Sequence, residues 1–424
     1  MTGVLNLVSC HGNDTIFGYV RISLTQSCVC PMSQLLPPLR LIGAQTLRDG
    51  VLAQRSVAIS GGRITKGPLP AVDLSGYLIL PGIIDMHGDA FERHVAPRRS
   101  AAFDLAAGLA SADRDAAANG VTTAWFAQSW SWEGSRRSPA HATSVMEALA
   151  LYRRRMLTDI RLQLRCETHM VDSGPQMIAA IERFGIDYVV FNNHLPDAVE
   201  MQRTRPADFA IWARELGHSA ETLGAAVDAV SAAEKRVPRH LCDLAEAFDR
   251  LGVLYGSHDD PDGETRERFS MIGARIAEFP TTRRAAAAAK AMNSPVLMGA
   301  PNVVRGKSQA GNIAARDLIA EGLCDALVSD YYYPALAQAA WRLVDEGVLD
   351  LARAWAMISS KPADIMRLAD RGVIAMGKRA DLTIVNAQTR AIEATICGGK
   401  MTYMAGGVAA RFFGMPQTLS LAAE

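Results

Sequence analysis

The chain of 424 residues lacks any apolar run near the length of about 20 residues that a membrane-spanning helix needs. It also lacks an excess of charge, because 44 basic and 44 acidic side chains give a formal net charge of zero. Proteins that bind nucleic acid in general present a net basic surface, so neither nucleic acid nor a membrane is expected as a partner. The composition, 49% hydrophobic and 21% charged, is typical of an ordinary globular protein.

Paired cysteine motifs are missing as well. The seven cysteines are scattered, and no second Cys or His pair follows the close pair Cys28 and Cys30 at zinc-finger spacing. We therefore expect free thiols and a location in the reducing cytoplasm. Residues 1–31 lack the pattern of a secretory signal, because Asn13 and Asp14 interrupt their apolar stretch. We interpret these residues as a disordered tail or as the result of a misassigned start.

The chain does contain a regular alternation of apolar, strand-like segments with Ala-, Leu- and Arg-rich segments of helical periodicity. The first strand is predicted from Leu78 to His87, and its nearly continuous apolar character suits a barrel strand covered on both faces. Seven further strand-like segments follow at 121–127, 162–166, 188–192, 253–256, 276–279, 296–298 and 326–328. Eight strands that alternate with helices predict a (β/α)₈ barrel of the TIM type.

The segments that flank this predicted barrel have a different character. Residues 32–80 and 372–412 read as short strands and turns, and we expect both to build one small β-sandwich. Residues 81–371 would then form the barrel. Within them, residues 197–250 are too many for a simple crossover and predict two or three helices, which we interpret as a lid or an assembly element.

Polar side chains stand where five of the apolar strands end. The carboxyl ends of barrel strands converge on one face, so we expect these side chains to meet across its mouth. They are His87, Asp89, Glu167, His194, His258 and Asp330. Three imidazoles and three carboxylates suit two divalent ions, with Zn²⁺ as the prediction and Mn²⁺ or Fe²⁺ as alternatives. Glu167 is the natural bridge between the ions, and Asp330 would bind one ion and accept a proton from its water.

A second set of side chains suggests a site for an anionic substrate. Its members are Arg93, Arg98, Asn302, Arg305 and Lys307. The last three lie in residues 299–312, a segment rich in Gly and Asn that follows a strand. We interpret this segment as a loop in which the backbone N–H groups near Gly306 and Gly311 form a phosphate cradle together with the Arg305 guanidinium. The alternative interpretation is a solvated loop with surface charges.

Two segments carry a resemblance to a known superfamily. Residues 80–87 resemble the P-G-x-I-D-x-H opening of the amidohydrolase superfamily, and residues 372–385 resemble its closing strand, G-x-I-x-x-G-x-x-A-D-L. Within the superfamily, residues 40–410 resemble the PhnM-like family of α-D-ribose 1-methylphosphonate 5-triphosphate diphosphatases. The Phe-Pro-Thr-Thr stretch at 279–282 and the Met-Gly-Ala-Pro-Asn-x-Val-Arg-Gly stretch at 298–306 are specific to that family.

The resemblance implies a role in phosphonate catabolism, in the carbon–phosphorus lyase pathway. The small phosphorylated substrate would be cut between its α and β phosphates and would release pyrophosphate, and the enzyme would be a homodimer or a higher homo-oligomer. A metal-activated water would attack phosphorus, with Asp330 as the proton acceptor and cationic side chains holding the polyphosphate. Asn193 stands where the family has an Asp before its His, so the loops that face the substrate have diverged and allow a related but different substrate.

Two other functions are considered. The first is an amidohydrolase that opens a cyclic amide or removes an acyl group with the same activated water. The cationic segment around Arg305 discriminates against it, because a neutral amide has no need of these charges. The second is a non-catalytic barrel that acts as a scaffold, and the presence of all six predicted ligands argues against this class.

Overall fold

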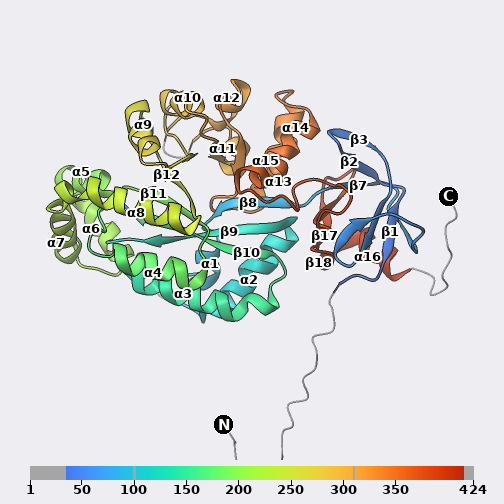
Figure 1. The fold of residues 1–424 in the computed structure, drawn as a ribbon, viewed down its shortest axis with the longest axis horizontal. Coiled ribbons are helices and arrows are strands. Elements are labelled where there is room, and N and C mark those ends of the chain that lie inside the picture. The colour runs from blue at the N-terminus through green and yellow to red at the C-terminus, as the bar shows by residue number, and fades with distance from the viewer. Residues whose placement is uncertain (1–34, 99–101, 309–310, 415–424) are drawn as a thin grey trace, which may run out of the picture. The chain divides into compact units, whose positions relative to one another are not determined.

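The computed structural model describes residues 35–98, 102–308 and 311–414 (Figure 1). The predictions made for residues 1–31 lie outside these ranges. The four cysteines in the described part, Cys166, Cys242, Cys324 and Cys397, are free thiols. In the same part of the chain, no helix has the length and apolar character needed to cross a membrane.

Eight parallel strands form the central sheet, and they follow one another in chain order. They are β8 (Ile83–Gly88), β9 (Val121–Trp130), β10 (Asp159–Glu167), β11 (Tyr188–Asn192), β12 (Leu254–His258), β13 (Ile276–Glu278), β14 (Val296–Gly299) and β15 (Ala326–Val328). A parallel bridge between Gly88 and Asp330 brings the two edge strands together, which closes the sheet into a barrel. The predicted (β/α)₈ fold is confirmed, and each of the eight predicted segments overlaps one barrel strand.

Helices cover the outside of these strands (Figure 1). They are α1 (Phe91–Val95), α2 (Leu105–Ala118), α3 (Pro139–Tyr152), α4 (Gly174–Phe184), α8 (Val237–Leu251), α9 (Gly263–Met271), α10 (Arg283–Ala291), α11 (Ala300–Arg305), α12 (Ala315–Ala320), α13 (Ala335–Asp345), α14 (Leu351–Ala356) and α15 (Ser360–Ile365). Several begin at a capping side chain: Asp104 accepts from the N–H of Ala107 at the start of α2, and Ser138 does the same for α3. Their buried faces form the main hydrophobic core together with the strands.

The prediction of one continuous strand from Leu78 to His87 is wrong. The chain forms β7 (Tyr77–Pro81) in the flanking sandwich and then β8 in the barrel, with Gly82 between them. A Cβ atom on Gly82 would lie 2.4 Å from Thr122 Oγ1, so only glycine allows the backbone to approach β9 this closely. The apolar run is continuous because both halves are buried, although they are buried in different layers.

Both ends of the described chain build the flanking sandwich, as expected. One sheet has the order β5-β4-β1-β6 and the other has the order β18-β17-β16-β7-β2-β3. The strands are β1 (Leu39–Ile42), β2 (Gln45–Arg48), β3 (Val51–Gln54), β4 (Val57–Ser60), β5 (Arg63–Thr65), β6 (Ala71–Asp73), β16 (Leu382–Asn386), β17 (Ile392–Cys397) and β18 (Lys400–Met404). Leu41, Ile59, Ile79 and Ile384 share one hydrophobic core, and α16 (Gly406–Phe413) adds Val408 to it.

The long segment after β11 has two parts. Its first helices, α5 (Leu195–Thr204), α6 (Pro206–Glu215) and α7 (Ala220–Ser231), have a small hydrophobic core of their own around Phe209 and Leu223. Figure 1 shows these three helices grouped beside the barrel. The next helix, α8, contacts α4 and β12 and is the ordinary crossover helix between two barrel strands. We therefore define residues 195–231 as the helical insertion; its role as a lid or an assembly element stays a prediction.

Candidate metal centre

Two groups of nitrogen and oxygen donors stand at the carboxyl ends of the barrel strands. The first group consists of His87, His258 and Glu278, from β8, β12 and β13. The second consists of Glu133, Glu167 and His194, which come from the turn after β9, the end of β10 and the residue before α5. Within each group the potential ligand atoms all lie within 4.8 Å of one another. The tertiary structure therefore divides four of the six predicted ligands into two pairs and adds a glutamate to each.

Glu278 contacts His87 from within the barrel interior. Its Oε2 lies 3.0 Å from His87 Nδ1, while its Oε1 accepts hydrogen bonds from Gln163 Nε2 and the Tyr188 hydroxyl, both at 2.6 Å. Gln163 and Tyr188 come from β10 and β11, which are not neighbours of β13, so these bonds cross the barrel interior. With Nδ1 occupied in this way, Nε2 of His87 is the nitrogen left for a metal ion. Burial alone would raise the pKa of Glu278, but the adjacent His87 imidazole lowers it.

The second group converges on the imidazole of His194. Its Nδ1 lies 2.7 Å from Glu133 Oε1 and 2.9 Å from Glu167 Oε1, and its backbone N–H donates to Glu167 Oε2 at 3.1 Å. Asn192 Nδ2 donates to Glu167 Oε1 at 2.5 Å. Burial would raise the pKa of Glu167, but the hydrogen bonds from His194 and Asn192 lower it to about 2. The carboxylate is therefore ionised, as a metal ligand must be.

Asp89 and Asp330 lie where the first and last barrel strands meet. The N–H of Asp89 donates to Asp330 O at 2.8 Å, and the N–H of Asp330 donates to His87 O at 3.0 Å. Burial and the nearby Asp89 raise the pKa of the Asp330 carboxyl to about 6. Both residues stand next to the first donor group, because these backbone bonds tie them to the end of β8.

Three residues beside the centre have left-handed backbone conformations: Asp259 (φ 57°), Phe279 (φ 50°) and Asp330 (φ 55°). This region is unusual for a bulky side chain such as Phe279, and such strain is concentrated at functional sites. The strained backbone places the Phe279 ring edge-on to His87, with 5.1 Å between ring centroids, and 5.0 Å from the ring of His258. The ring thereby covers both imidazoles with an apolar surface.

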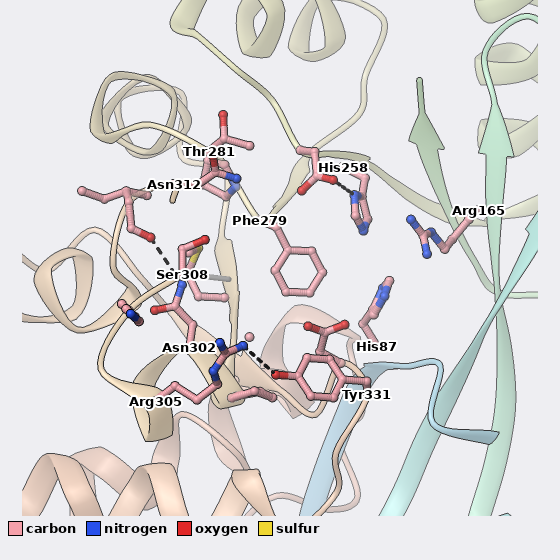
Figure 2. Close-up of a pocket in the computed structure, with 18 residues that line it drawn as sticks. His87, Arg165, His258, Phe279, Thr281, Asn302, Arg305, Ser308, Asn312 and Tyr331 are labelled. Carbon is pink, nitrogen blue, oxygen red and sulfur yellow. Dashed lines mark hydrogen bonds and ion pairs between the residues drawn. The ribbon is translucent and has the colours of Figure 1, made fainter. Parts of the chain in front are cut away.

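The centre opens into a cavity of about 230 Å³ (Figure 2). His87, His258 and Asp330 line it together with Arg305 and Lys307. Figure 2 shows the two histidines and Arg165 on one side, Arg305 and Asn302 on the other, and the Phe279 ring between them. A ligand in this cavity would therefore touch His87 and His258 of the first donor group at one end and the cationic side chains of Arg305 and Lys307 at the other.

The two arginines that follow the first strand are placed differently. Neither Arg93 nor Arg98 lines the cavity, and both side chains are exposed. Arg93 lies on α1 and donates to the backbone oxygen of Tyr331, a residue of the cavity wall. It therefore supports the rim, and the structure gives Arg98 no contact with the cavity.

The prediction that residues 299–312 form a loop with a backbone cradle is partly wrong. Residues 300–305 are helix α11, and Gly306, at φ 77°, ends this helix with its N–H bonded to Asn302 O and Val303 O. That amide is consequently engaged within the helix cap. The Asn302 side chain is also engaged, since its Oδ1 accepts from Ala315 N at 3.0 Å. The segment lines the cavity with Asn302, Ser308 and Asn312 among others, and its charged side chains there are Arg305 and Lys307.

The donor groups suit divalent cations. Each combines imidazole nitrogen with carboxylate oxygen, which is a set that Zn²⁺, Mn²⁺ and Fe²⁺ accept. The strand-end pattern of the sequence does not indicate Glu133 or Glu278 as members of the site. The predicted second strand stops at Ala127 but β9 continues to Trp130, so Glu133 stands only three residues beyond the strand end. Glu278 belongs to an apolar strand and gave no sign that its carboxylate would point inward.

Comparison with known proteins gives concordant results. Residues 215–402 match the amidohydrolase family. The α-D-ribose 1-methylphosphonate 5-triphosphate diphosphatase of Escherichia coli (strain K12) is 30% identical over 350 residues, which cover 76% of this chain and 87% of that protein.

Among solved structures, a β-aspartyl dipeptidase from Fervidobacterium islandicum AW-1 has a TM-score of 0.60 at 14% identity and covers 88% of this chain and 98% of its own. An N-acetylglucosamine-6-phosphate deacetylase from Pasteurella multocida has a TM-score of 0.57 at 11% identity, with 86% and 99% covered. At these identities the likeness shows the fold alone.

The role assigned to Glu278 predicts that Glu278→Gln weakens metal binding. The amide cannot accept at both oxygen positions, so His87 loses its fixed orientation, and affinity for a divalent ion should fall by about 10- to 100-fold. Titration of the metal-free protein with Zn²⁺ against a chromogenic chelator measures this change. Glu267→Gln, an exposed position on α9, is the matched control and should bind as the unaltered protein does. Equal affinities in all three proteins would contradict the role of Glu278.

Proposed function

The chain belongs to the amidohydrolase family, in the branch of α-D-ribose 1-methylphosphonate 5-triphosphate diphosphatase, and we propose that this hydrolase cleaves the α–β phosphoanhydride of a ribosyl phosphonate 5-triphosphate to release pyrophosphate. The observation that carries the proposal is that one cavity contains both His87 and His258 of the metal centre and the cations Arg305 and Lys307. A polyphosphate requires both features, whereas a neutral amide requires only the first.

Two divalent ions, Zn²⁺ in our proposal, would be held by the six ligands His87, Asp89, Glu167, His194, His258 and Asp330. When bound, such ions lower the pKa of water and neutralise charge on phosphoryl oxygens. Glu167 would be the carboxylate shared by the two ions, and His194 and Asn192 hold it in a fixed orientation by hydrogen bonds to its two oxygens. Glu278 keeps His87 in the tautomer that offers Nε2.

The side chains that line the cavity have separate tasks. Asp330 lies next to His87 on the cavity wall and accepts the proton of the attacking water. Arg305 and Lys307 hold the β and γ phosphates, so that the α phosphorus lies toward the donor groups. Phe279 keeps solvent from the two imidazoles, which strengthens electrostatic interactions there.

We propose that the substrate of this protein resembles that of the related diphosphatase but need not be the same compound. Asn193, which stands where the family pattern has Asp, accepts a hydrogen bond from the N–H of Leu195 at the start of α5. The helical insertion begins two residues later, at Leu195. The homodimer and the cytoplasmic location stay predictions.

A substrate panel tests the proposed reaction. Metal-loaded protein should release pyrophosphate, seen by phosphorus NMR, from a ribose 5-triphosphate that carries a 1-phosphonate. The control compounds are a hydantoin and an N-acyl amino acid, which should remain intact. Release of orthophosphate alone, or turnover of a control compound without turnover of the triphosphate, would show that the proposed reaction is wrong.

Replacement of the proton acceptor should affect the rate more than metal binding. Asp330→Asn keeps an oxygen ligand but cannot take up the proton, so kcat should fall by about 10²- to 10⁴-fold while most of the bound metal remains. Steady-state kinetics and metal analysis of the same sample measure both effects. Asp317→Asn, at an exposed position on α12, should leave both unchanged. A normal kcat for Asp330→Asn would remove this residue from its role.

Loss of the cavity cation should affect substrate binding. Arg305→Ala removes a charged donor from the polyphosphate, and KM should rise roughly tenfold or more with a smaller change in kcat. Arg284→Ala, at an exposed position on α10, is the control for loss of one positive charge. If the two variants have the same KM, then the α11 segment does not bind the substrate.

A further inference from the structure

Glu133 is a buried acid that belongs to no motif of the sequence. We propose that Glu133 is a ligand of the ion held by Glu167 and His194, and that the helical insertion, residues 195–231, keeps it in place. The proposal rests on the metal dependence of the proposed function and extends it in two respects. It adds a ligand from the turn after the second barrel strand, and it assigns to the insertion the role of holding that ligand in position.

The carboxylate of Glu133 is aimed at the second donor group. Its side chain is 0% exposed, and its backbone N–H is fixed by a 3.1 Å hydrogen bond to Ser131 Oγ. Arg137, one turn further along the chain, forms an ion pair with Oε2. The other oxygen, Oε1, lies 2.7 Å from His194 Nδ1. One oxygen is therefore neutralised by an arginine, while the other is directed at a proposed metal ligand.

The three potential ligand atoms of this group converge on one small space. Glu133 Oε1 and Glu167 Oε1 lie 2.7 Å and 2.9 Å from the same nitrogen of His194. Both carboxylates contact the same imidazole nitrogen, so positive charge between them is favoured, either as a proton on His194 or as a metal ion in its place. Arg137 pairs only with the far oxygen of Glu133, so it does not fill this need. A divalent ion would satisfy both carboxylates and the imidazole together.

The helical insertion holds the backbone that carries Glu133. His218, in the turn between α6 and α7, donates from Nε2 to the backbone oxygen of Glu133 at 3.1 Å. Gly134 has φ 76°, and a Cβ atom there would lie 2.7 Å from His218 Nε2, so the contact requires glycine. On the other side of Glu133, the ring of Trp132 packs edge-on against Trp212 of α6, with centroids 6.4 Å apart.

The insertion thus reaches the metal centre from two directions. It begins directly after His194, and it holds the turn that carries Glu133 by a hydrogen bond and an aromatic contact. Trp132 packs against the small core of α5, α6 and α7, and His218 lies in the turn between α6 and α7. Displacement of these helices would move Glu133 and His194 relative to Glu167, which stays on β10.

The test is a titration of the metal-free, full-length protein with Co²⁺, followed by equilibrium dialysis and by visible absorption, which reports cobalt coordination. The unaltered protein should bind two ions. In Glu133→Gln, which preserves the size of the side chain, one of the two sites should weaken at least about tenfold and its absorption band should change. The affinity of the other site should be unchanged. Glu221→Gln, at an exposed position on α7, is the control and should match the unaltered protein.

The role of the helical insertion in holding Glu133 is tested separately with His218→Ala. This substitution leaves every proposed ligand in place. The same site should weaken, by less than in Glu133→Gln, and thermal unfolding should show that the variant is folded. Two ions bound with unchanged affinity and absorption in Glu133→Gln would overturn the proposal. Binding of a single ion by the unaltered protein would overturn it as well. Because no substrate is present, these results are independent of whether pyrophosphate release is observed.

Discussion

The meeting of the first and last barrel strands is the constraint on which the site depends. Asp85 on β8 is fully buried and accepts two hydrogen bonds from Ser329, one from the backbone N–H at 2.9 Å and one from the hydroxyl at 2.6 Å. Burial raises the pKa of this carboxyl to about 6. Such burial is unfavourable without partners, so the two bonds specify one register between strand ends separated by 244 residues in the chain. That register places Asp330 beside His87.

Because the barrel is closed in this way, different elements line the two sides of the cavity. Parallel strands direct their carboxyl ends to one face, and the residues there are held by backbone bonds that belong to the barrel. The α11 segment, by contrast, is a short helix outside the strands, and it supplies cations to the same cavity. A protein with a net charge of zero thereby has a locally cationic wall opposite His87, His258 and Asp330. The absence of net charge excludes a broad affinity for nucleic acid, but it does not exclude binding of one small polyanion.

The parts that could be predicted are those governed by local pattern. The eight strands are buried on both faces and therefore read as apolar runs, and the polar residues that end them were visible as interruptions of those runs. Glu278 was invisible for the opposite reason, since its carboxylate lies within a buried strand and is stabilised by Gln163 and Tyr188 from across the barrel. The sequence predicts a loop around α11 because Asn302 and the flanking Gly299 and Gly306 favour turns, whereas Gly306 in fact caps the helix.

The amino-acid sequence by itself therefore determined the barrel, the sandwich built from both chain ends, the family and the strand-end residues. It could do so because burial and strand termination are determined by neighbouring residues. Both are therefore visible in the sequence as apolar runs that end in polar residues. Only the tertiary structure decided how the donors divide into two groups, which glutamates join them, and that the insertion contacts the turn of Glu133. These features depend on side chains brought together from distant strands. The pattern within one segment does not indicate which other segments lie close to it in space.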